Sequence, residues 1–487
     1  MDIDFLTAKG LYFRYFEQSP NYILENADFS FKKGKVTVML GTSGCGKSTL
    51  AAVLCGLYPE NGGVLSQGTI TLYNGEALQD MDCQKRAGYL SMMFQNPDLQ
   101  FCMDTLRKEL QFCMENICVP KEEMDDRIQT FATKLHLEKM LDTPLHSLSG
   151  GEKQKAALCC LLLLNSQGFL FDEPFANLDD DSAKELVSLL KAHHQEYQTT
   201  ILAIDHRLDH WLDIADEIVV LGPKGQILAD GITKENLPSQ QALFADQGLF
   251  YPREIPAFTP APPKEALLVL EHLSICRGAS KEYLLSDISA AIPKESFTAL
   301  LGPSGTGKTT LFSAILGQKK YEGSIRLDGR EIRNIKTRQL YREVGTVFQN
   351  PGNQFISTRI LDEVLSSLKI WNQDLPEKTL IEKAQMLLNQ YRLKPYQRYS
   401  PYMLSQGQQR RLAVLSILTG GQRLLLLDEP TYGQDQASTK AIMDQLTGLV
   451  RHQGLTVLFS THDRRLAAEY ADKIYEISEK ELMEWKN

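Results

Sequence analysis

The sequence has few long apolar runs, and its first residues are neither basic nor strongly apolar. Its longest apolar run, from Ala156 to Leu164, is about half the length of a membrane-spanning helix. Its first residues, Met1 to Leu6, have neither the basic stretch nor the apolar stretch of a signal peptide. We therefore expect a protein without a signal peptide or a membrane span of its own, and we interpret the apolar run as a buried helix.

The chain also lacks an excess of basic over acidic residues, and its cysteines do not form close pairs in the sequence. The formal net charge is −9 at pH 7, which gives no support to nucleic-acid binding, because phosphate backbones favour a basic surface. The 9 cysteines are odd in number, and none belongs to a Cys-x-x-Cys pair. This pattern indicates reduced thiols in a cytosolic protein rather than disulfides or a zinc site.

What the chain does contain is one pattern that occurs twice. Its 487 residues are too many for one ordinary core, and 43% are hydrophobic and 23% charged, as in soluble globular proteins. Lys47 recurs 261 positions later, and three further residues recur 256 positions later in the same order, namely Ser149, Asp172 and His206. We expect two copies of one α/β unit, over 1–250 and 265–487, joined by the proline-rich linker 251–264.

The pattern begins with a glycine-rich loop, G-x-x-x-x-G-K-[ST], which cradles nucleotide phosphates. Glycines let backbone N–H groups converge on phosphate oxygens, the lysine adds a positive charge, and the hydroxyl can ligate Mg²⁺. Apolar strands are predicted before both loops, at 36–40 and 297–301, and a helix is predicted over 48–55. The residues expected to bind the nucleotide are Gly41, Ser43, Gly44, Gly46, Lys47, Ser48 and Thr49 in the first copy, and Gly302, Ser304, Gly305, Gly307, Lys308, Thr309 and Thr310 in the second.

Each copy also has an apolar strand that ends in Asp-Glu-Pro. Such a pair of carboxylates lies at the carboxyl edge of a parallel sheet, where ligands of these sheets bind. Alone the pair would also fit the start of a helix, but its occurrence with the loop in both copies favours a catalytic role. We expect Asp172 and Asp428 to help hold Mg²⁺, and Glu173 and Glu429 to orient and deprotonate the attacking water.

The remaining elements complete a fold prediction. Alternating residues at 11–15 and 27–31 predict strands of an antiparallel layer, and 103–140 has the helical spacing of a small insertion. The sequence therefore predicts an α/β protein with two P-loop NTPase units. Each unit is expected to have a parallel-sheet core, an antiparallel β layer and a helical subdomain.

A further motif lies shortly before the Asp-Glu strand. It reads Leu148-Ser-Gly-Gly-Glu152 in the first copy and Leu404-Ser-Gln-Gly-Gln408 in the second. With this motif in this order, nearly the whole chain resembles the ATP-binding cassette (ABC) family, whose signature is LSGG followed by Gln or Glu. The resemblance implies that the signature of one cassette contacts the γ-phosphate of the ATP held by the other. The residues implied are Ser149, Gly150 and Gly151 in the first signature, and Ser405 and Gly407 in the second.

The resemblance implies roles for other residues too. Gln95 and Gln349 match the loop glutamine that senses Mg²⁺ and water, and His206 and His462 match the switch histidine at the γ-phosphate. Tyr15 fits the aromatic residue that stacks on adenine. The D-loop falls at Asn177 to Asp179 in the first copy and at Gly433 to Asp435 in the second.

The two copies depart from the family pattern at different places. Gln406 replaces the first glycine of the second signature, which would serve the nucleotide on Lys47. Cys276 stands opposite Tyr15, so the second site either lacks an aromatic platform or uses Tyr283. We expect two sites that both hydrolyse ATP but are unequal.

The residues after the two glutamines indicate a subfamily. Gln95-Asn-Pro-Asp-Leu-Gln-Phe101, with Glu109, and Gln349-Asn-Pro-Gly-Asn-Gln-Phe355, with Glu363, look like ATPases of energy-coupling-factor importers. Such importers take up vitamins or transition-metal ions. The resemblance implies ATP and Mg²⁺ as cofactors, a transmembrane coupling subunit and a substrate-binding membrane subunit as partners, no nucleic acid, and a position at the cytoplasmic face of the membrane.

Two other interpretations stay open. Sugar importers also have tandem cassettes, but their second phosphate loop is typically degenerate, whereas Lys308 and Thr309 are intact here. Soluble ribosome-associated ABC-F proteins usually join their cassettes through a long charged helix, whereas 251–264 is short and rich in proline. Transport is the favoured prediction, and the transported substrate is not readable from this chain.

Overall fold

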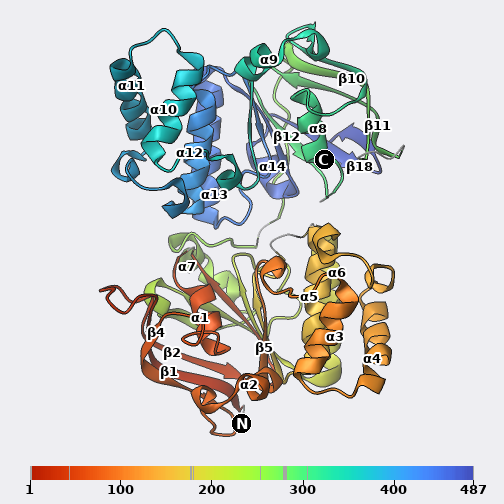
Figure 1. Cartoon of the computed structure of the whole chain (residues 1–487), viewed down its shortest axis with the longest axis vertical. Helices are drawn as coiled ribbons and strands as arrows, with labels where there is room; N and C mark the ends of the chain where they lie inside the picture. The colour runs from red at the N-terminus through yellow and green to blue at the C-terminus, as the bar shows by residue number, and fades with distance from the viewer. Residues whose placement is uncertain are drawn as a thin grey trace. The chain divides into compact units, whose positions relative to one another are not determined.

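The computed structural model describes residues 3–42, 44–175, 178, 180–252, 254–277, 282–303 and 305–485, apart from the side chain of Gln406. The chain divides into two compact units, Met1–Pro252 and Arg253–Asn487. The first is coloured from red to light green and the second from green to blue (Figure 1). Both units have the same kinds of layer.

The first unit contains two sheets. The antiparallel sheet has the strand order β2-β1-β4, with β1 at Asp4–Arg14, β2 at Leu24–Lys32 and β4 at Val64–Leu72. The larger sheet has the order β5-β6-β7-β3-β8-β9 and is parallel except for β9. Its strands are β3 (Val36–Gly41), β5 (Leu90–Met93), β6 (Gly168–Asp172), β7 (Thr200–Asp205), β8 (Glu217–Leu221) and β9 (Ile227–Ile232).

Helix α1 of the first unit, which follows β3 and the glycine-rich loop as predicted, packs between the two sheets. Its Leu50 and Leu54 share a core with Phe13 of the antiparallel sheet and with Met39 of β3. Val38, next to Met39 in β3, faces the opposite side and packs in the core that contains α5 and α6. This alternation follows from the period of two along a strand. The helices are α1 (Lys47–Leu54), α2 (Cys83–Tyr89), α3 (Leu106–Asn116), α4 (Lys121–Lys134), α5 (Gly150–Leu164), α6 (Asp180–Tyr197) and α7 (Gln241–Asp246).

The second unit repeats this arrangement. Its antiparallel sheet has the order β11-β10-β13-β14, with β10 at Ala266–Cys276, β11 at Tyr283–Pro293, β13 at Glu322–Leu327 and β14 at Arg330–Glu331. Its larger sheet has the order β15-β16-β17-β12-β18-β19, with β12 at Phe297–Leu301, β15 at Val344–Val347, β16 at Leu424–Leu427, β17 at Thr456–Thr461, β18 at Lys473–Ser478 and β19 at Glu481–Glu484. The helices are α8 (Lys308–Ile315), α9 (Thr337–Glu343), α10 (Ile360–Trp371), α11 (Glu377–Gln390), α12 (Gln406–Leu418), α13 (Gln436–Gln453) and α14 (Arg464–Tyr470).

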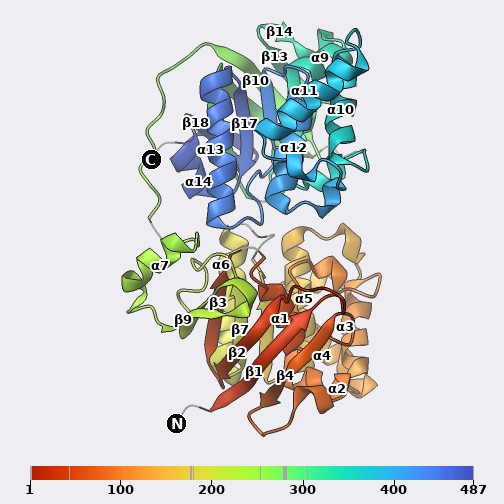
Figure 2. The same ribbon diagram turned by 90° about the vertical axis from the view of Figure 1, so that its left-hand side faces the viewer.

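Each unit also has a helical subdomain. It is formed by α3, α4 and the start of α5 in the first unit, and by α10, α11 and the start of α12 in the second (Figure 2). The helices predicted over 103–140 are thus α3 and α4, and the predicted α/β fold with an antiparallel layer is confirmed. Within the described ranges, every helix is too short or too polar to cross a bilayer.

Candidate functional site

The glycine-rich loops lie where the central strand of each large sheet meets a helix. Gly46 directly precedes α1 with φ 105°, and Gly307 directly precedes α8 with φ 106°, in the region that disfavours side chains. A Cβ atom at Gly46 would lie 3.2 Å from the carbonyl oxygen of Ile23. The loop therefore requires glycine at this position, which leaves the helix N-terminus open to an anion.

Both loop lysines are buried and turned back over the loop. Lys47 Nζ donates to the carbonyl oxygens of Gly41, at 2.7 Å, and Thr42, at 3.1 Å. Lys308 Nζ donates to the equivalent carbonyls of the second loop, at 2.6 and 2.9 Å. The two loops thus hold a positive charge in the same way. Ser43 and Ser304, two of the residues predicted to bind the nucleotide, lie outside the described residues.

The predicted Mg²⁺ ligands are paired in both units. Ser48 Oγ donates to Asp172 Oδ1 at 3.1 Å, and Thr309 Oγ1 donates to Asp428 Oδ2 at 2.6 Å. Burial, and then the charge of Glu173, raise the pKa of Asp172 to about 6. A hydroxyl and a carboxylate side by side are hard oxygen donors, the kind that Mg²⁺ prefers.

The first unit brings two predicted site residues, Gln95 and His206, into contact with Glu173. Gln95 Nε2 donates to Glu173 Oε2 at 2.7 Å, and His206 Nε2 lies 2.7 Å from Glu173 Oε1. The Nδ1 atom of His206 is buried, and no described group forms a hydrogen bond with it. Glu173 itself has φ 48°, a conformation that is rare for a residue other than glycine.

The second unit surrounds Glu429 differently. His462 Nδ1 lies 2.8 Å from Glu429 Oε2, and Lys308 Nζ lies 3.6 Å from Glu429 Oε1. Burial acts to raise the pKa of Glu429, but the hydrogen bond and charge of His462, together with Lys308, outweigh it, so this pKa is lowered. Gln349, the counterpart of Gln95, is exposed. Each of the two carboxylates therefore has a histidine partner, but the second neighbour is the amide of Gln95 in the first unit and the ammonium of Lys308 in the second.

Sequence reasoning missed Arg410, which lies in the second site only. Its guanidinium donates to the carbonyl oxygens of Phe348, at 2.9 Å, and Gln349, at 2.8 Å. Burial lowers the pKa of Arg410 to about 10, although the charges of Asp428 and Glu429 oppose this shift. The first unit has the neutral Gln154 at the equivalent position, so an alignment of the two copies would have found this difference.

The signature serines begin α5 and α12. The side chain of Ser149 accepts a hydrogen bond from the N–H of Glu152, and the Glu152 carboxylate accepts one from the N–H of Ser149; Ser405 and Gln408 form the same capping box. Both serines are exposed. Within the first unit, α1 and α5 pack on opposite faces of the large sheet, so the two motifs lie in different layers.

The expected adenine side differs between the units. Tyr15 is 42% exposed, its hydroxyl lies 2.6 Å from Thr49 Oγ1, and its ring makes edge contacts with Phe13 and Tyr58. In the second unit, Cys276 pairs with Tyr283 across the β10–β11 ladder. Tyr283 is therefore placed beside the position that corresponds to Tyr15.

The D-loop prediction is only partly within the described structure. Asn177 and Asp179 lie outside the described residues, whereas Asp435 is buried and caps α13 by accepting a hydrogen bond from the N–H of Ser438.

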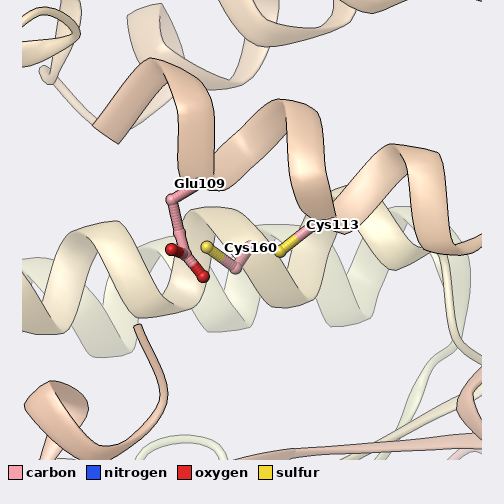
Figure 3. A group of neighbouring side chains, drawn as sticks. All are labelled: Glu109, Cys113 and Cys160. Carbon is pink, nitrogen blue, oxygen red and sulfur yellow. The ribbon is translucent and has the colours of Figure 1, made fainter. Parts of the chain in front are cut away.

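A largely buried cluster of one carboxylate and two thiols on α3 and α5, in which Cys113 is half-buried, adds a feature that the motifs did not predict. The side chains of Glu109, Cys113 and Cys160 approach within 4.8 Å of one another (Figure 3). Glu109 Oε2 accepts hydrogen bonds from the N–H groups of Cys102, at 2.9 Å, and Met103, at 2.7 Å. The second unit has serines in place of the two thiols, yet its Glu363 makes the same pair of bonds. In both units the glutamate therefore holds the loop that follows the site glutamine.

Comparison with known proteins places these motifs in a family. The family model described as ABC transporter matches the chain twice, over residues 24–176 and 285–432. Each match contains a phosphate loop, a signature and an Asp-Glu pair.

Relatives match over nearly the full chain. One from Bacillus subtilis (strain 168), provisionally named HMP/thiamine import ATP-binding protein YkoD, is 34% identical, with 97% of this chain and 89% of the relative covered. One from Methanosarcina mazei, provisionally named ABC transporter ATP-binding protein, is 30% identical, with 96% and 86% covered. A solved structure of archaeal ribosome recycling factor aABCE1 with ribosomal stalk protein aP1 matches with a TM-score of 0.63 at 20% identity, over 97% of this chain and 90% of that one. That likeness shows the fold alone.

Proposed function

Because the chain belongs to the ABC transporter family, whose ATPases couple ATP hydrolysis to transport, we propose that it is the ATP-binding subunit of an energy-coupling-factor type importer for a vitamin or metal ion. The observation that carries the ATPase part is that each unit holds a complete set of loop lysine, hydroxyl–aspartate pair, and glutamate bonded to histidine. The importer part is supported by the name of the B. subtilis relative and by the Gln-Asn-Pro loop of each unit, whose following residues donate backbone hydrogen bonds to a glutamate.

The residues present fit ATP with Mg²⁺. Ser48 with Asp172, and Thr309 with Asp428, would hold the cation through oxygen atoms. The buried Nδ1 of His206, to which no described group bonds, suits a phosphate oxygen. When bound, ATP would supply the phosphoanhydride bond that is broken, and Mg²⁺ would neutralise part of the negative charge of the phosphates.

The chain's own groups then divide the work. Lys47 and Lys308 hold positive charge at the β- and γ-phosphates, because their buried ammonium groups are fixed over the loop. Glu173 and Glu429 orient the attacking water and accept its proton. His206 and His462 hold these carboxylates in place, as their bonds of 2.7 and 2.8 Å indicate.

We further propose that 1–250 and 265–487 act as the two cassettes, with 251–264 as their linker. Each signature would complete the site of the other cassette, because α1 and α5 of one unit lie on opposite faces of its sheet. Closure around ATP would drive a transmembrane coupling subunit and a substrate-binding subunit through the loops of Gln95 and Gln349. The chain would then act at the cytoplasmic face of the membrane.

Two experiments test these proposals. Replacing both Glu173 and Glu429 with glutamine should lower ATP turnover about a hundredfold or more while ATP still binds, since a general base is lost and the pocket is kept. Unchanged turnover would rule out their role as bases. Purification of the chain from membranes should bring the two membrane subunits with it, whereas a chain recovered only with ribosomes would support the ribosome-associated alternative.

A further inference from the structure

The loop that carries the site glutamine begins where the first strand of each parallel sheet ends. In the second unit, the β15–β16 ladder closes with the N–H of Asp428 donating to the carbonyl oxygen of Val347, at 3.0 Å. The next two carbonyl groups along the chain, those of Phe348 and Gln349, lie beyond this ladder. Carbonyl groups that leave a sheet need donors from outside it, and these donors decide how firmly the loop is held.

Arg410, in α12, supplies such donors in the second unit. Its Nη1 donates to the carbonyl oxygen of Phe348 at 2.9 Å, and its Nη2 donates to that of Gln349 at 2.8 Å. Nη2 also lies 3.5 Å from the carbonyl oxygen of Glu429. The side chain is 4% exposed, so water competes little for these bonds, and the planar guanidinium fixes the direction of its donors. One side chain thus ties the helix that begins at the signature to the glutamine loop and to the backbone of Glu429.

The first unit holds the same loop in another way. Gln154 stands in place of Arg410, and among the described groups its neutral amide bonds one of the two carbonyls, that of Gln95, at 3.5 Å. Oε1 of Gln154 is buried, and no described group bonds to it. The short bond there joins the side chain of Gln95 to Glu173, at 2.7 Å, whereas Gln349 is exposed. The loop is therefore held through its glutamine side chain in the first unit and through its backbone in the second.

We propose that Arg410 is a positioning residue of the second ATP site, which fixes the backbone of the Gln349 loop beside Glu429 so that Gln349 can reach Mg²⁺ and the attacking water. The inference rests on the proposed function, because the role of Gln349 comes from that proposal. Arg410 acts through the loop, since its bonds go to backbone carbonyls. A neutral amide in its place cannot hold both carbonyls with the fixed geometry of a guanidinium.

The first measurement is hydrogen exchange in the full chain without nucleotide, followed by mass spectrometry. The central variant is Arg410→Gln, which installs the residue that the first unit already accommodates at this position. Exchange of the amides at 348–354 should accelerate about tenfold or more, because the loop loses two bonds to a buried cation. The matching loop at 94–100 is an internal reference and should not change. Arg451→Gln, at an exposed residue near the end of α13, is the charge control and should leave both loops unchanged.

The second measurement separates kcat from KM for ATP in the full chain. Arg410→Gln should lower kcat about threefold or more, because a loosely held Gln349 is misplaced for the reaction. KM should stay within about twofold, since Lys308 and its phosphate loop are untouched. Arg410→Lys keeps the charge on a single ammonium group, and it should lie between the wild type and Arg410→Gln in both measurements.

Unchanged exchange at 348–354 in Arg410→Gln would overturn the proposal. Equal acceleration at 94–100 would also overturn it, because that result indicates a general loss of stability. Faster exchange at 348–354 with unchanged kcat would show that the loop is held by Arg410 without consequence for the reaction, and would overturn the positioning role. A wild-type chain without ATPase activity would refute the proposed function instead, and that failure is distinct because the exchange measurement involves no turnover.

Discussion

Glu173 and Glu429 hold equivalent positions, yet their neighbours differ in charge. Glu173 is bonded by the neutral amide of Gln95, whereas Glu429 lies 3.6 Å from the ammonium of Lys308. Arg410 adds a second buried cation near Glu429 only. These contacts give the two carboxylates different electrostatic environments, although the Asp-Glu-Pro motifs that contain them are identical.

We therefore predict unequal losses when the glutamates are changed one at a time. Glu429→Gln should lower the ATPase rate more than Glu173→Gln, because the proposed partner of the Glu429 site is the intact signature at Ser149. The site of Glu173 would instead receive the signature that carries Gln406. Steady-state ATPase assays of both single variants test this, and equal losses would contradict unequal sites.

Trp211 contacts the site through Asp205, the residue before His206. It is fully buried, and its Nε1 donates to Asp205 Oδ2 at 2.9 Å. Burial raises the pKa of Asp205, and the bond from Trp211 opposes that shift. Asp205 in turn accepts from the backbone N–H of His206, at 2.7 Å, so it fixes the start of the histidine loop.

Trp211→Phe should lower the free energy of unfolding of the first unit by about 2 kcal/mol, because a buried carboxylate loses its donor. Burial already disfavours the ionised form of Asp205 in the folded state, and the bond from Trp211 partly offsets this. Without that bond the ionised carboxylate destabilises the fold further. The loss should therefore be largest above the pKa of Asp205, where the group is ionised, and should shrink as the pH falls and the carboxyl group is protonated. Denaturant unfolding followed by circular dichroism measures it. Trp371→Phe, at a half-buried tryptophan in the second unit, is the control and should cost less.

At the scale of elements, α3 is tied to the loop before it through one side chain. Glu109 is 3% exposed, and its carboxylate holds the N–H groups of Cys102 and Met103. Glu109→Ala should cost about 2–4 kcal/mol, because two partly buried donors lose their acceptor. Hydrogen exchange of those two amides should accelerate, while Glu115→Ala on the exposed face of α3 should leave them protected. Unchanged exchange in Glu109→Ala would show that the loop is held by other contacts.

Most elements were predictable because their local patterns are strong. The run at 36–40 is buried at every residue as β3, and the helical spacing over 103–140 became α3 and α4. The site residues could be assigned because their motifs are continuous in sequence. The bond from Gln95 to Glu173 joins motifs far apart in the chain, so only the folded structure shows it. The positive φ of Glu173 was likewise invisible, since no residue type there demands it.

Across the whole molecule, the two units share their chemical residues and differ in what surrounds them. The ion pair of Lys155 and Glu185 becomes Arg411 and Ala441 in the second unit. The buried pair of Asp205 and Trp211 has no counterpart of the same chemistry, because Thr461 and Ala467 occupy those positions. One chain with two units can keep such differences, since each unit always has the other as its neighbour in sequence.

If the two units act as a pair, the linker between them should determine activity. A short tether raises the effective concentration of one cassette near the other to about millimolar. A protease site placed at 254–257, where every side chain is exposed, allows the two cassettes to be separated after folding. If each signature completes the site of the other cassette, the ATPase rate per mole of cleaved protein should fall as the protein is diluted below micromolar. The uncleaved protein should keep a constant rate over the same range. A cleaved protein whose rate does not depend on dilution would mean either that the cassettes stay tightly associated or that each hydrolyses ATP alone, and sedimentation of the cleaved sample separates these two outcomes.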